Sequence, residues 1–329
     1  MTAYKAFLVE KEDKLVTHSI VERSTDDLPE GDLLIKVQYS SVNYKDALSA
    51  KGLPGVTRNY PHTPGIDAAG VVAESTVSHF NEGDEVIAIG FDLGMNTPGG
   101  YGEYIRVPAS WVTPLPAGMT IRESMVIGTA GFTAALCIGK LEQMGAAPAD
   151  GPVIVSGATG GVGSVAIALL AQSGYEVIAS SGKADKEEYL KSLGASSVIG
   201  REELSKENPR PMLGTDYAHG VDTVGGEILS NIIKSLRYGG SVAICGLVAS
   251  VAFSTTVLPF ILRGVNVLGI DSVELPIEQK NEIWNRLASD WKLNTLDMMT
   301  VEIGLEDISV TVDSIFAGKG TGRTLVVHN

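Results

Sequence analysis

The sequence predicts an α/β protein in which a doubly wound parallel-sheet domain is inserted into a β-rich domain. Three observations lead to this fold class. The 329 residues exceed the usual size of a single hydrophobic core, so two domains are expected. Near residue 123 the pattern changes from short strands to alternating strands and helices. Within 153–174 an apolar strand, a glycine-rich turn and a helix follow one another directly.

The section up to about residue 120 has the pattern of short strands separated by turns. Its apolar and β-branched runs are bounded by Gly, Pro and Asp, and no long helical pattern interrupts them. We therefore expect an antiparallel, barrel-like domain here. The expected strands lie in 5–10, 31–42, 68–75 and 83–90.

From residue 123 onward, strand and helix patterns alternate. A long apolar helix is expected over 123–145, and the short, continuously apolar strands that follow are typical of a parallel sheet buried on both faces. The last section predicts a helix over 277–291, a short helix and a final strand that returns to the first domain. We therefore predict a β-rich catalytic domain, 1–122 plus 295–329, and an inserted nucleotide-binding domain, 123–294. The expected strands of the parallel sheet lie in 153–158, 176–182, 197–200, 221–224, 241–246 and 265–270.

The composition excludes several classes of partner. The net charge of −14 repels nucleic acid and anionic membrane surfaces. The two cysteines, Cys137 and Cys245, lie in apolar stretches, so we expect buried free thiols rather than a disulfide. Charged residues interrupt the N-terminal segment, and we expect no apolar run of the length that spans a membrane. These features predict a cytoplasmic protein.

The most specific motif is the glycine-rich turn. Small residues let a pyrophosphate approach backbone N–H groups at the N-terminus of a helix. The A-x-G-x-x-G pattern places Ala158 where the usual motif has its first glycine, followed by Gly160 and Gly163. The motif therefore predicts dinucleotide binding. The alternative is a tight strand-to-helix turn without a ligand.

The end of the second strand of this domain predicts which dinucleotide binds. Sites that prefer NAD generally have Asp or Glu there, bonded to the ribose 2′-hydroxyl. This chain has Ser180-Ser181-Gly182-Lys183 instead, and hydroxyls with a lysine suit a 2′-phosphate. NADPH is therefore favoured. The alternative is that Lys183 is only a solvated residue at the start of a helix.

Several motifs resemble the medium-chain dehydrogenase/reductase family, and within it the subfamily of acrylyl-CoA reductases and quinone oxidoreductases. This resemblance implies a GroES-like catalytic domain made from both chain ends, with the nucleotide-binding domain inserted. It also implies a homodimer formed through the edge strand at 265–271. The matching segments are 40–48, 60–72, 128–137, 156–164, 189–196, 221–226, 259–273 and 322–326.

The resemblance further implies a set of NADPH contacts. One more family contact falls near Gly318, where the local sequence departs from relatives. The implied contacts are Tyr44, Leu247, Ile261 and Ser272 at the nicotinamide end, Thr159, Gly160, Gly161 and Val162 at the pyrophosphate, and Ser181, Gly182, Lys183 and Arg201 around the 2′-phosphate.

No metal is predicted. Zinc-dependent relatives have a cysteine in the segment that corresponds to 40–46 and Gly-His-Glu after the proline-rich turn. This chain has Asn43 at the first position and Gly65-Ile66-Asp67 at the second. Two cysteines are too few for a structural zinc lobe, and the five histidines show no metal-ligand spacing. His62, the histidine nearest the expected cleft, is interpreted as a loop residue bonded locally.

Without a metal Lewis acid, reduction of a conjugated double bond is the favoured chemistry. Tyr44 is our candidate acid or hydrogen-bond donor, although it could merely stack against the cofactor. Asn43 could orient the substrate or hold a turn. Asp46 and Asp67 could form polar links in the cleft floor, and we favour a structural role for both. Arg323 could meet an anionic acyl-carrier group, but we favour a solvated position near the chain end.

Three functions remain open at this stage. The first is NADPH-dependent reduction of an α,β-unsaturated acyl thioester such as acrylyl-CoA, with a small-molecule electrophile as the partner. The second is quinone reduction, which uses the same cofactor and an open apolar cleft. The third is a nucleotide-binding sensor or structural protein without turnover.

Overall fold

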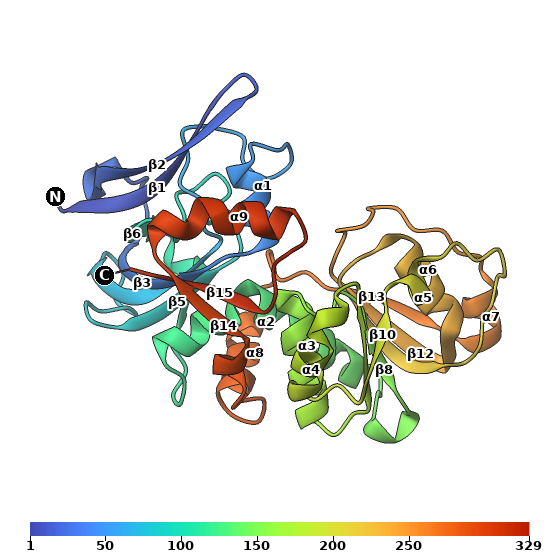
Figure 1. Ribbon diagram of the computed structural model, residues 1–329. Coiled ribbons are helices and arrows are strands. Elements are labelled where there is room, and N and C mark those ends of the chain that lie inside the picture. The colour runs from blue at the N-terminus through green and yellow to red at the C-terminus, as the bar shows by residue number, and fades with distance from the viewer. Residues whose placement is uncertain (329) are drawn as a thin grey trace. The chain divides into compact units, whose positions relative to one another are not determined.

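The computed structural model describes residues 1–328, which divide into two compact units. Unit 1 contains Met1–Thr129, Ser272–Lys292 and the chain from Leu296 to the end of the described residues. Unit 2 contains Ala130–Asp271 and Leu293–Thr295. Unit 1 therefore holds both the start and the end of the described chain (Figure 1).

Unit 2 is built on a six-stranded parallel sheet in the order β10-β9-β8-β11-β12-β13. Counted from β8 as strand one, this order is 3-2-1-4-5-6, which is the order of the doubly wound dinucleotide-binding fold. The predicted fold class is confirmed. The strands are β8 (Val153–Val155), β9 (Val177–Ser181), β10 (Ser197–Gly200), β11 (Tyr217–Asp222), β12 (Leu236–Ile244) and β13 (Asn266–Gly269).

The helices of unit 2 pack on this sheet and bury its apolar side chains (Figure 1). All three residues of β8 are fully buried, which explains its continuous apolar sequence. In α6, Ile228, Leu229, Ile232 and Ile233 recur at helical spacing and pack against the sheet. The helices are α3 (Gly161–Gln172), α4 (Glu187–Ser192), α5 (Glu202–Ser205), α6 (Gly226–Ser235) and α7 (Leu258–Arg263).

Unit 1 contains a seven-stranded sheet in the order β14-β15-β3-β4-β5-β7, with β6 also paired to β3. Its pairs are antiparallel, apart from the parallel pair β14–β15. Strands β1 and β2 form a separate antiparallel hairpin. The strands are β1 (Ala3–Glu12), β2 (Leu15–Ser24), β3 (Leu33–Ser41), β4 (Asp67–Ser75), β5 (Glu85–Ile89), β6 (Tyr104–Val107), β7 (Val112–Pro114), β14 (Thr300–Ile303) and β15 (Arg323–Val327).

Three helices belong to unit 1: α1 (Tyr44–Ala50), α8 (Ile277–Ala288) and α9 (Ile308–Phe316). α9 packs against α1, so the C-terminal part of the chain covers the segment that follows β3 (Figure 1). The buried residues Val42, Ala47, Ile308 and Val312 belong to one apolar cluster there. This packing fixes the position of α1, which begins within the family-matching segment 40–48 and carries Tyr44.

The predicted apolar helix is α2 (Ile121–Gln143), but it is broken at Gly128. Gly128 has φ 49° and ψ −163°, a conformation that only glycine adopts readily. By length and composition α2 could cross a membrane, contrary to the expectation that no such run exists, but 78% of its apolar window is buried inside the protein. The apolar sequence therefore reflects two core helices joined at a glycine.

Residues 272–292 lie in unit 1, whereas the sequence analysis assigns them to the nucleotide-binding domain. The reason is the inner face of α8. Trp284 and Leu287 are buried on this face, and so is Lys280 at 1% exposure. The Lys280 ammonium donates to the backbone oxygens of Ile89 (2.9 Å) and Val273 (3.0 Å), which ties α8 to the end of β5.

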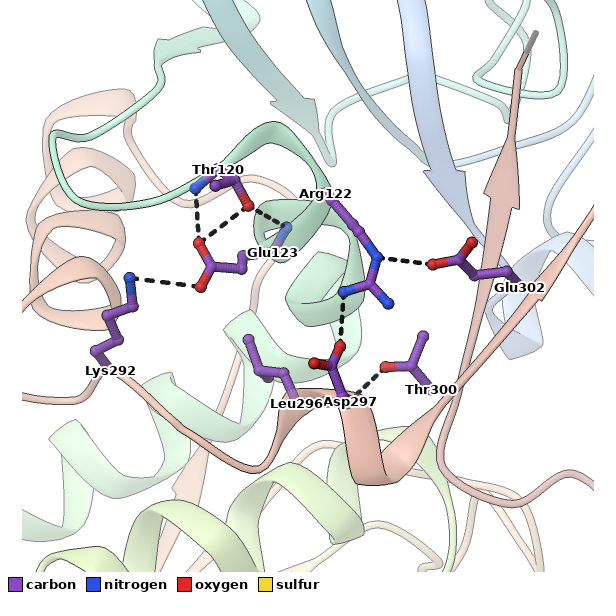
Figure 2. A network of polar contacts seen from close by, with 8 residues as sticks. All are labelled: Thr120, Arg122, Glu123, Lys292, Leu296, Asp297, Thr300 and Glu302. Atoms are coloured by element: carbon purple, nitrogen blue, oxygen red, sulfur yellow. Dashed lines mark hydrogen bonds and ion pairs between the residues drawn. The ribbon is translucent and has the colours of Figure 1, made fainter.

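An ion-pair network connects the start of α2 with the segment that leads into β14 (Figure 2). Arg122 donates to Asp297 (2.8 Å) and to Glu302 (2.7 Å), while Lys292 approaches Glu123 at 3.4 Å. These side chains are partly exposed, so water weakens their attraction. The network joins parts of unit 1 that are distant in sequence.

The two cysteines lie in unit 2 and are free thiols. Cys137 is fully buried, as expected, whereas Cys245 is only half-buried because it follows β12 near the surface. The Cys245 thiol donates to the backbone oxygen of Asp222 at 3.6 Å. A hydrogen bond with Cys245 and complete burial raise the pKa of Cys137 well above its usual range.

Candidate functional site

The glycine-rich turn lies between β8 and α3, at the point where the strand order of unit 2 reverses. Gly157 has φ 59°, and a Cβ on Gly163 would lie 2.4 Å from the Gly157 oxygen, so both positions require glycine. Gly160 caps the N-terminus of α3, and a Cβ there would meet only one atom, the Gly157 oxygen at 3.3 Å. The turn thus leaves open space in front of the first α3 amides, which fits a bound pyrophosphate.

A buried polar network joins the ends of β8 and β11 beside this turn. The Ser156 hydroxyl donates to Asp222 (2.6 Å), and the Gly225 amide donates to the other Asp222 oxygen (2.8 Å). Thr223 bonds Ser156 twice, through its amide and its hydroxyl, both at 3.0 Å. Burial is the main cause that raises the pKa of Asp222. The network holds the two strand ends that frame the turn.

The residues predicted to surround a 2′-phosphate come together at the ends of β9 and β10. The Ser181 hydroxyl accepts a bond from the Lys183 amide (3.0 Å), and the Ser181 carbonyl accepts one from the Arg201 amide (2.9 Å). The Arg201 guanidinium lies against Gly182, where a Cβ would be 3.0 Å from its Cζ. Burial, followed by the positive charge of Lys186, lowers the pKa of Lys183.

Within residues 1–328, the Arg201 side chain has no ion pair. A guanidinium without an acidic partner, next to a half-buried lysine and an exposed glycine backbone, is suited to bind an anion. This arrangement fits the 2′-phosphate of NADPH.

The predicted nicotinamide-end residues are divided between the units. Leu247 and Ile261 belong to unit 2 and are 53% and 69% exposed. Ser272 belongs to unit 1 and is 8% exposed. The pyrophosphate residues Thr159, Gly160, Gly161 and Val162 and the 2′-phosphate residues lie together within unit 2.

In unit 1, Asp67 is the centre of a buried hydrogen-bond cluster at the start of β4. One carboxylate oxygen accepts bonds from the Ser41 hydroxyl, from the Asn43 amide nitrogen (2.8 Å) and from the Thr129 backbone amide (2.9 Å). The other oxygen accepts from the Thr129 hydroxyl (2.5 Å). Asp67 is 0% exposed, so these donors replace the water that an ionised carboxylate requires.

Arg323, at the start of β15, supplies the positive charge of this cluster. Its guanidinium donates to the Val126 carbonyl (2.8 Å), the Ser41 hydroxyl (2.8 Å) and the Asn43 side-chain oxygen (3.4 Å). Arg323 is only 2% exposed, so the expectation of a solvated residue is wrong. The sequence suggested solvation because the position is close to the chain end, but β15 lies inside the sheet, between β14 and β3.

Gly128 permits this cluster to form. A Cβ on Gly128 would lie 2.5 Å from both the Asp67 carboxylate and the Ser41 hydroxyl, and 2.7 Å from the Arg323 guanidinium. The break in α2 therefore brings the Thr129 amide to Asp67 without a side chain between them.

Asp46 is the second buried carboxyl of unit 1, and it holds the start of α1. It accepts bonds from the backbone amides of Asn43 (2.8 Å), Gly65 (3.1 Å) and Ile66 (2.9 Å). Burial first, and then the negative charge of Asp67, raise the pKa of Asp46 to about 7. The structural roles expected for Asp46 and Asp67 agree with these contacts.

The donor set around Asp67 does not fit a zinc ion. Both carboxylate oxygens are already occupied by hydrogen-bond donors, and a guanidinium bonds the same Ser41 hydroxyl. Asn43 and Ile66 provide neither a thiolate nor an imidazole. No group of three His, Cys, Asp or Glu side chains that could hold a metal exists within residues 1–328. His62 bonds the Gly94 carbonyl (2.9 Å), and burial lowers its pKa.

Beside this cluster, unit 1 has a small, partly open pocket. One wall of the pocket is the turn after β5, in which Phe91 has φ 52°. Phe91 lies between the Lys280 ammonium, 3.7 Å from its ring centre, and the Trp111 ring, whose centre is 5.6 Å away. These two contacts hold the turn in place. The lining residues are Lys45, Ile66, Gly90, Phe91, Leu93, Met95, Thr129 and Val273.

Tyr44 and Asn43 do not line this pocket. Tyr44 is half-buried, and its ring is nearly parallel to that of Phe316, with centres 6.5 Å apart. Asn43 is 8% exposed, and its amide group is bonded to Asp67 and Arg323. Asn43 therefore holds the turn before α1, which is one of the two roles considered for it.

Sequence reasoning missed several residues of this site. Gly128 and Thr129 lie in the matching segment 128–137, and Lys45 lies in the matching segment 40–48, so these segments contained the signal although only their neighbours were chosen. Arg323 and Lys280 carried no local signal, because their partners are far away in the sequence.

The comparisons agree with this architecture. The chain matches the alcohol dehydrogenase GroES-like domain over residues 29–117 and the zinc-binding dehydrogenase domain over residues 161–289. It is 44% identical over 326 residues to YhfP of Bacillus subtilis, provisionally named a quinone oxidoreductase, with 99% of each chain covered. It is 41% identical over 328 residues to the acrylyl-CoA reductase AcuI of Ruegeria pomeroyi, again with 99% of each covered.

Two solved structures are similar to this chain at about the same level of sequence identity. The YhdH oxidoreductase of Salmonella enterica in complex with NADP has a TM-score of 0.96 and 42% identity, with 99% of this chain and 100% of that chain covered. YhfP of Bacillus subtilis with NAD bound has a TM-score of 0.97 and 43% identity, with 100% of both chains covered. The chain therefore belongs to the medium-chain dehydrogenase/reductase family of oxidoreductases, in the group of acrylyl-CoA reductases and YhfP-type quinone oxidoreductases.

Proposed function

We propose that the protein is an NADPH-dependent reductase that transfers hydride to the conjugated double bond of an α,β-unsaturated acyl thioester of the acrylyl-CoA type. The observation that carries this proposal is the small, largely apolar pocket of unit 1. Its lining is apolar or glycine apart from Lys45 and Thr129. Apolar side chains beside one cation match an acyl group that carries a carbonyl oxygen.

The cofactor site of unit 2 supports NADPH over NADH. Lys183 and Arg201 offer positive charge at the position of the 2′-phosphate, and no carboxylate follows β9 there to repel it. The NADP complex of the Salmonella enterica relative agrees with this preference, whereas the Bacillus subtilis relative has NAD bound. Replacing Arg201 by Ala should weaken NADPH binding about 10–100-fold and leave NADH binding unchanged.

The reaction requires hydride from the cofactor and stabilisation of the charge that forms on the substrate. NADPH supplies the hydride when it is bound. The apolar side chains of Ile66, Phe91 and Leu93 line the pocket of unit 1, and a hydrogen-bond donor at its wall would stabilise the charge on the carbonyl oxygen. Asp67 and Arg323 hold Asn43 and the start of α1, which keeps the pocket wall in a fixed position.

We also propose that the reaction needs no zinc. The support is that the position next to Asn43, Ile66 and Asp67 is occupied by the Arg323 guanidinium and its hydrogen bonds. Activity should therefore survive extensive treatment with a chelator. Loss of activity on chelation, and its recovery with Zn²⁺, would contradict this part of the proposal.

The test of the proposed function follows the near-ultraviolet absorbance of NADPH with acrylyl-CoA and with a simple quinone as separate substrates. Turnover with the thioester and little turnover with the quinone is the expected result. Turnover with the quinone alone would contradict the thioester assignment. Quinone reduction is the second candidate because YhfP is provisionally named for it. Stable NADPH binding without oxidation by either electrophile would point to a sensor.

We further propose a homodimer formed through β13, located in the cytoplasm. β13 is the edge strand of its sheet, and exposed apolar side chains flank it in α7, including Leu262 at 58% exposure. Leu262→Glu should shift the sedimentation coefficient toward that of a monomer. Leu15→Glu, at a 66% exposed position on β2, is the matched control and should leave it unchanged.

A further inference from the structure

Lys45 is the charged residue among the described side chains that line the pocket of unit 1. The rest of the lining is apolar or glycine, apart from Thr129, whose hydroxyl is committed to Asp67. Lys45 is the second residue of α1 and is half-buried. An ammonium group at the wall of an apolar pocket is costly to keep without a partner, which calls for an explanation.

The ammonium of Lys45 has no ion pair and no hydrogen bond within the described chain, residues 1–328. The buried acids near α1 are already engaged. Asp46 accepts three backbone amides, and Asp67 accepts four bonds from Ser41, Asn43 and Thr129. Lys45 therefore remains available to a molecule that enters the pocket.

The two neighbours of Lys45 are less suited to this task. The Asn43 side chain is bonded at both its oxygen and its nitrogen, to Arg323 and to Asp67. The ring of Tyr44 faces Phe316, and Tyr44 is absent from the pocket lining. Of the three consecutive residues, only Lys45 combines a free donor with a place at the pocket wall.

We propose that the Lys45 ammonium is the catalytic hydrogen-bond donor to the carbonyl oxygen of the electrophile in this pocket. This inference rests on the proposed function. Hydride adds to the β-carbon, and the electron pair of the carbon–carbon π bond moves to form the enolate, which places negative charge on the carbonyl oxygen. Lys45 keeps its proton throughout and stabilises that oxygen, and a proton from water then reaches the α-carbon.

The positive charge of Lys45 should stabilise a negative oxygen more strongly in this pocket than it would at the surface. The pocket wall is largely apolar and Lys45 is half-buried, so a hydrogen bond from this cation to a developing oxyanion is less screened than at the open surface. The same donor would serve an oxygen of a quinone, because reduction also places negative charge there. Lys45 would therefore have the same role with either electrophile, and the turnover assay with both substrates distinguishes them.

The test compares Lys45→Met, which keeps the length and loses the charge, with Lys45→Arg. We expect Lys45→Met to lower kcat with acrylyl-CoA about 100–1,000-fold, as removal of one oxyanion donor does elsewhere, while NADPH binding measured by calorimetry stays unchanged. Lys45→Arg should retain a measurable part of the activity. Lys51→Met is the matched control at the end of the same helix, where the lysine pairs with Asp313, and it should keep full turnover.

A rescue experiment separates a chemical role from a structural one. Lys45→Ala should regain turnover when a small alkylammonium salt is added, whereas the matched sodium salt should restore nothing. Normal turnover of wild type together with normal turnover of Lys45→Met overturns this inference alone. Wild type that oxidises NADPH with neither electrophile overturns the proposed function, and the inference with it.

Discussion

Asp67 in unit 1 and Asp222 in unit 2 are both carboxyl groups at 0% exposure, and each lies at the end of a β-strand beside a candidate site. Their surroundings differ in one respect. The Asp67 cluster contains a buried guanidinium, that of Arg323. Asp222 has no ion pair within residues 1–328 and is satisfied by the Ser156 hydroxyl and the Gly225 amide.

The comparison shows two ways to bury an acid. Asp222 uses neighbours contributed by the adjacent strand and its own turn, and burial raises its pKa, so its site tolerates the neutral form. The negative charge of Asp67 is accompanied by the positive charge of Arg323, which lies on β15, the last strand in the sequence. The Asp67 cluster therefore contains a buried cation, whereas the network around Asp222 is built from neutral donors.

Removing the cation should have the largest effect. Arg323→Met leaves Asp67 and Asp46 buried without a counter-charge, so we expect the free energy of unfolding to fall by about 3–5 kcal/mol. Urea denaturation followed by circular dichroism measures this change. Arg106→Met, which removes an ion pair with the largely exposed Glu74, is the control and should cost at most about 1 kcal/mol. Equal losses in the two variants would show that Arg323 is not balancing buried charge.

Neutralising each acid in turn tests the comparison directly. In both Asp67→Asn and Asp222→Asn, a neighbouring hydroxyl can rotate to accept from the new amide: Thr129 in one case and Ser156 in the other. The two variants therefore differ mainly in charge. We expect Asp67→Asn to cost about 1.5–3 kcal/mol more than Asp222→Asn in urea unfolding. The opposite order would remove the distinction between the two clusters.

The pH dependence of stability should report Asp46. Its pKa is raised from an ordinary 3.8 to about 7 by burial and by Asp67, so the folded protein binds this proton more tightly than the unfolded chain. Its contribution to stability is complete below about pH 4 and is lost as the pH rises toward about 7, by at most about 1.4 kcal/mol per pH unit. The difference in unfolding free energy between wild type and Asp46→Asn, measured across this range, should decline with pH. A flat difference would mean that Asp46 stays ionised.

The smallest effect is expected for the exposed ion pairs of Arg122 (Figure 2). Its partners Asp297 and Glu302 are 83% and 46% exposed, so solvent screens their attraction. Arg122→Met should lower the free energy of unfolding, measured by urea denaturation, by at most about 1 kcal/mol. High salt should reduce the difference between wild type and variant further. A loss as large as that of Arg323→Met would show that burial is not what separates these arginines.

Most of the fold could be predicted because its signals are local. The apolar runs of β8 to β13 and the glycine turn before α3 are each contained in a few consecutive residues. Strand β2 carried too weak a signal, since none of its side chains is fully buried and polar residues interrupt its apolar ones. Residues 272–292 were assigned to the other domain, because the contacts of Lys280 lie with residues near position 90.

The candidate site was predictable where a motif lies on one short segment. Ser181, Gly182 and Lys183 are consecutive, and the fold brings Arg201 next to Gly182, while their contact with a 2′-phosphate stays a prediction. The Asp67 cluster could not be predicted in the same way, because it combines β3, β4, the break in α2 and β15. Only the folded chain brings the Arg323 guanidinium to Asn43 and Ser41.

The positions of the two cysteines matter if the substrates are conjugated thioesters or quinones. Conjugated thioesters and quinones alkylate thiolates, so an enzyme that binds such substrates can be inactivated by alkylation of its own cysteines. Here Cys137 is fully buried with a raised pKa, and the half-buried Cys245 has its thiol hydrogen directed at a backbone oxygen. The chain has no other cysteine to offer. Burial therefore keeps Cys137, one of the two thiols, away from the reactive compounds that the protein is proposed to consume.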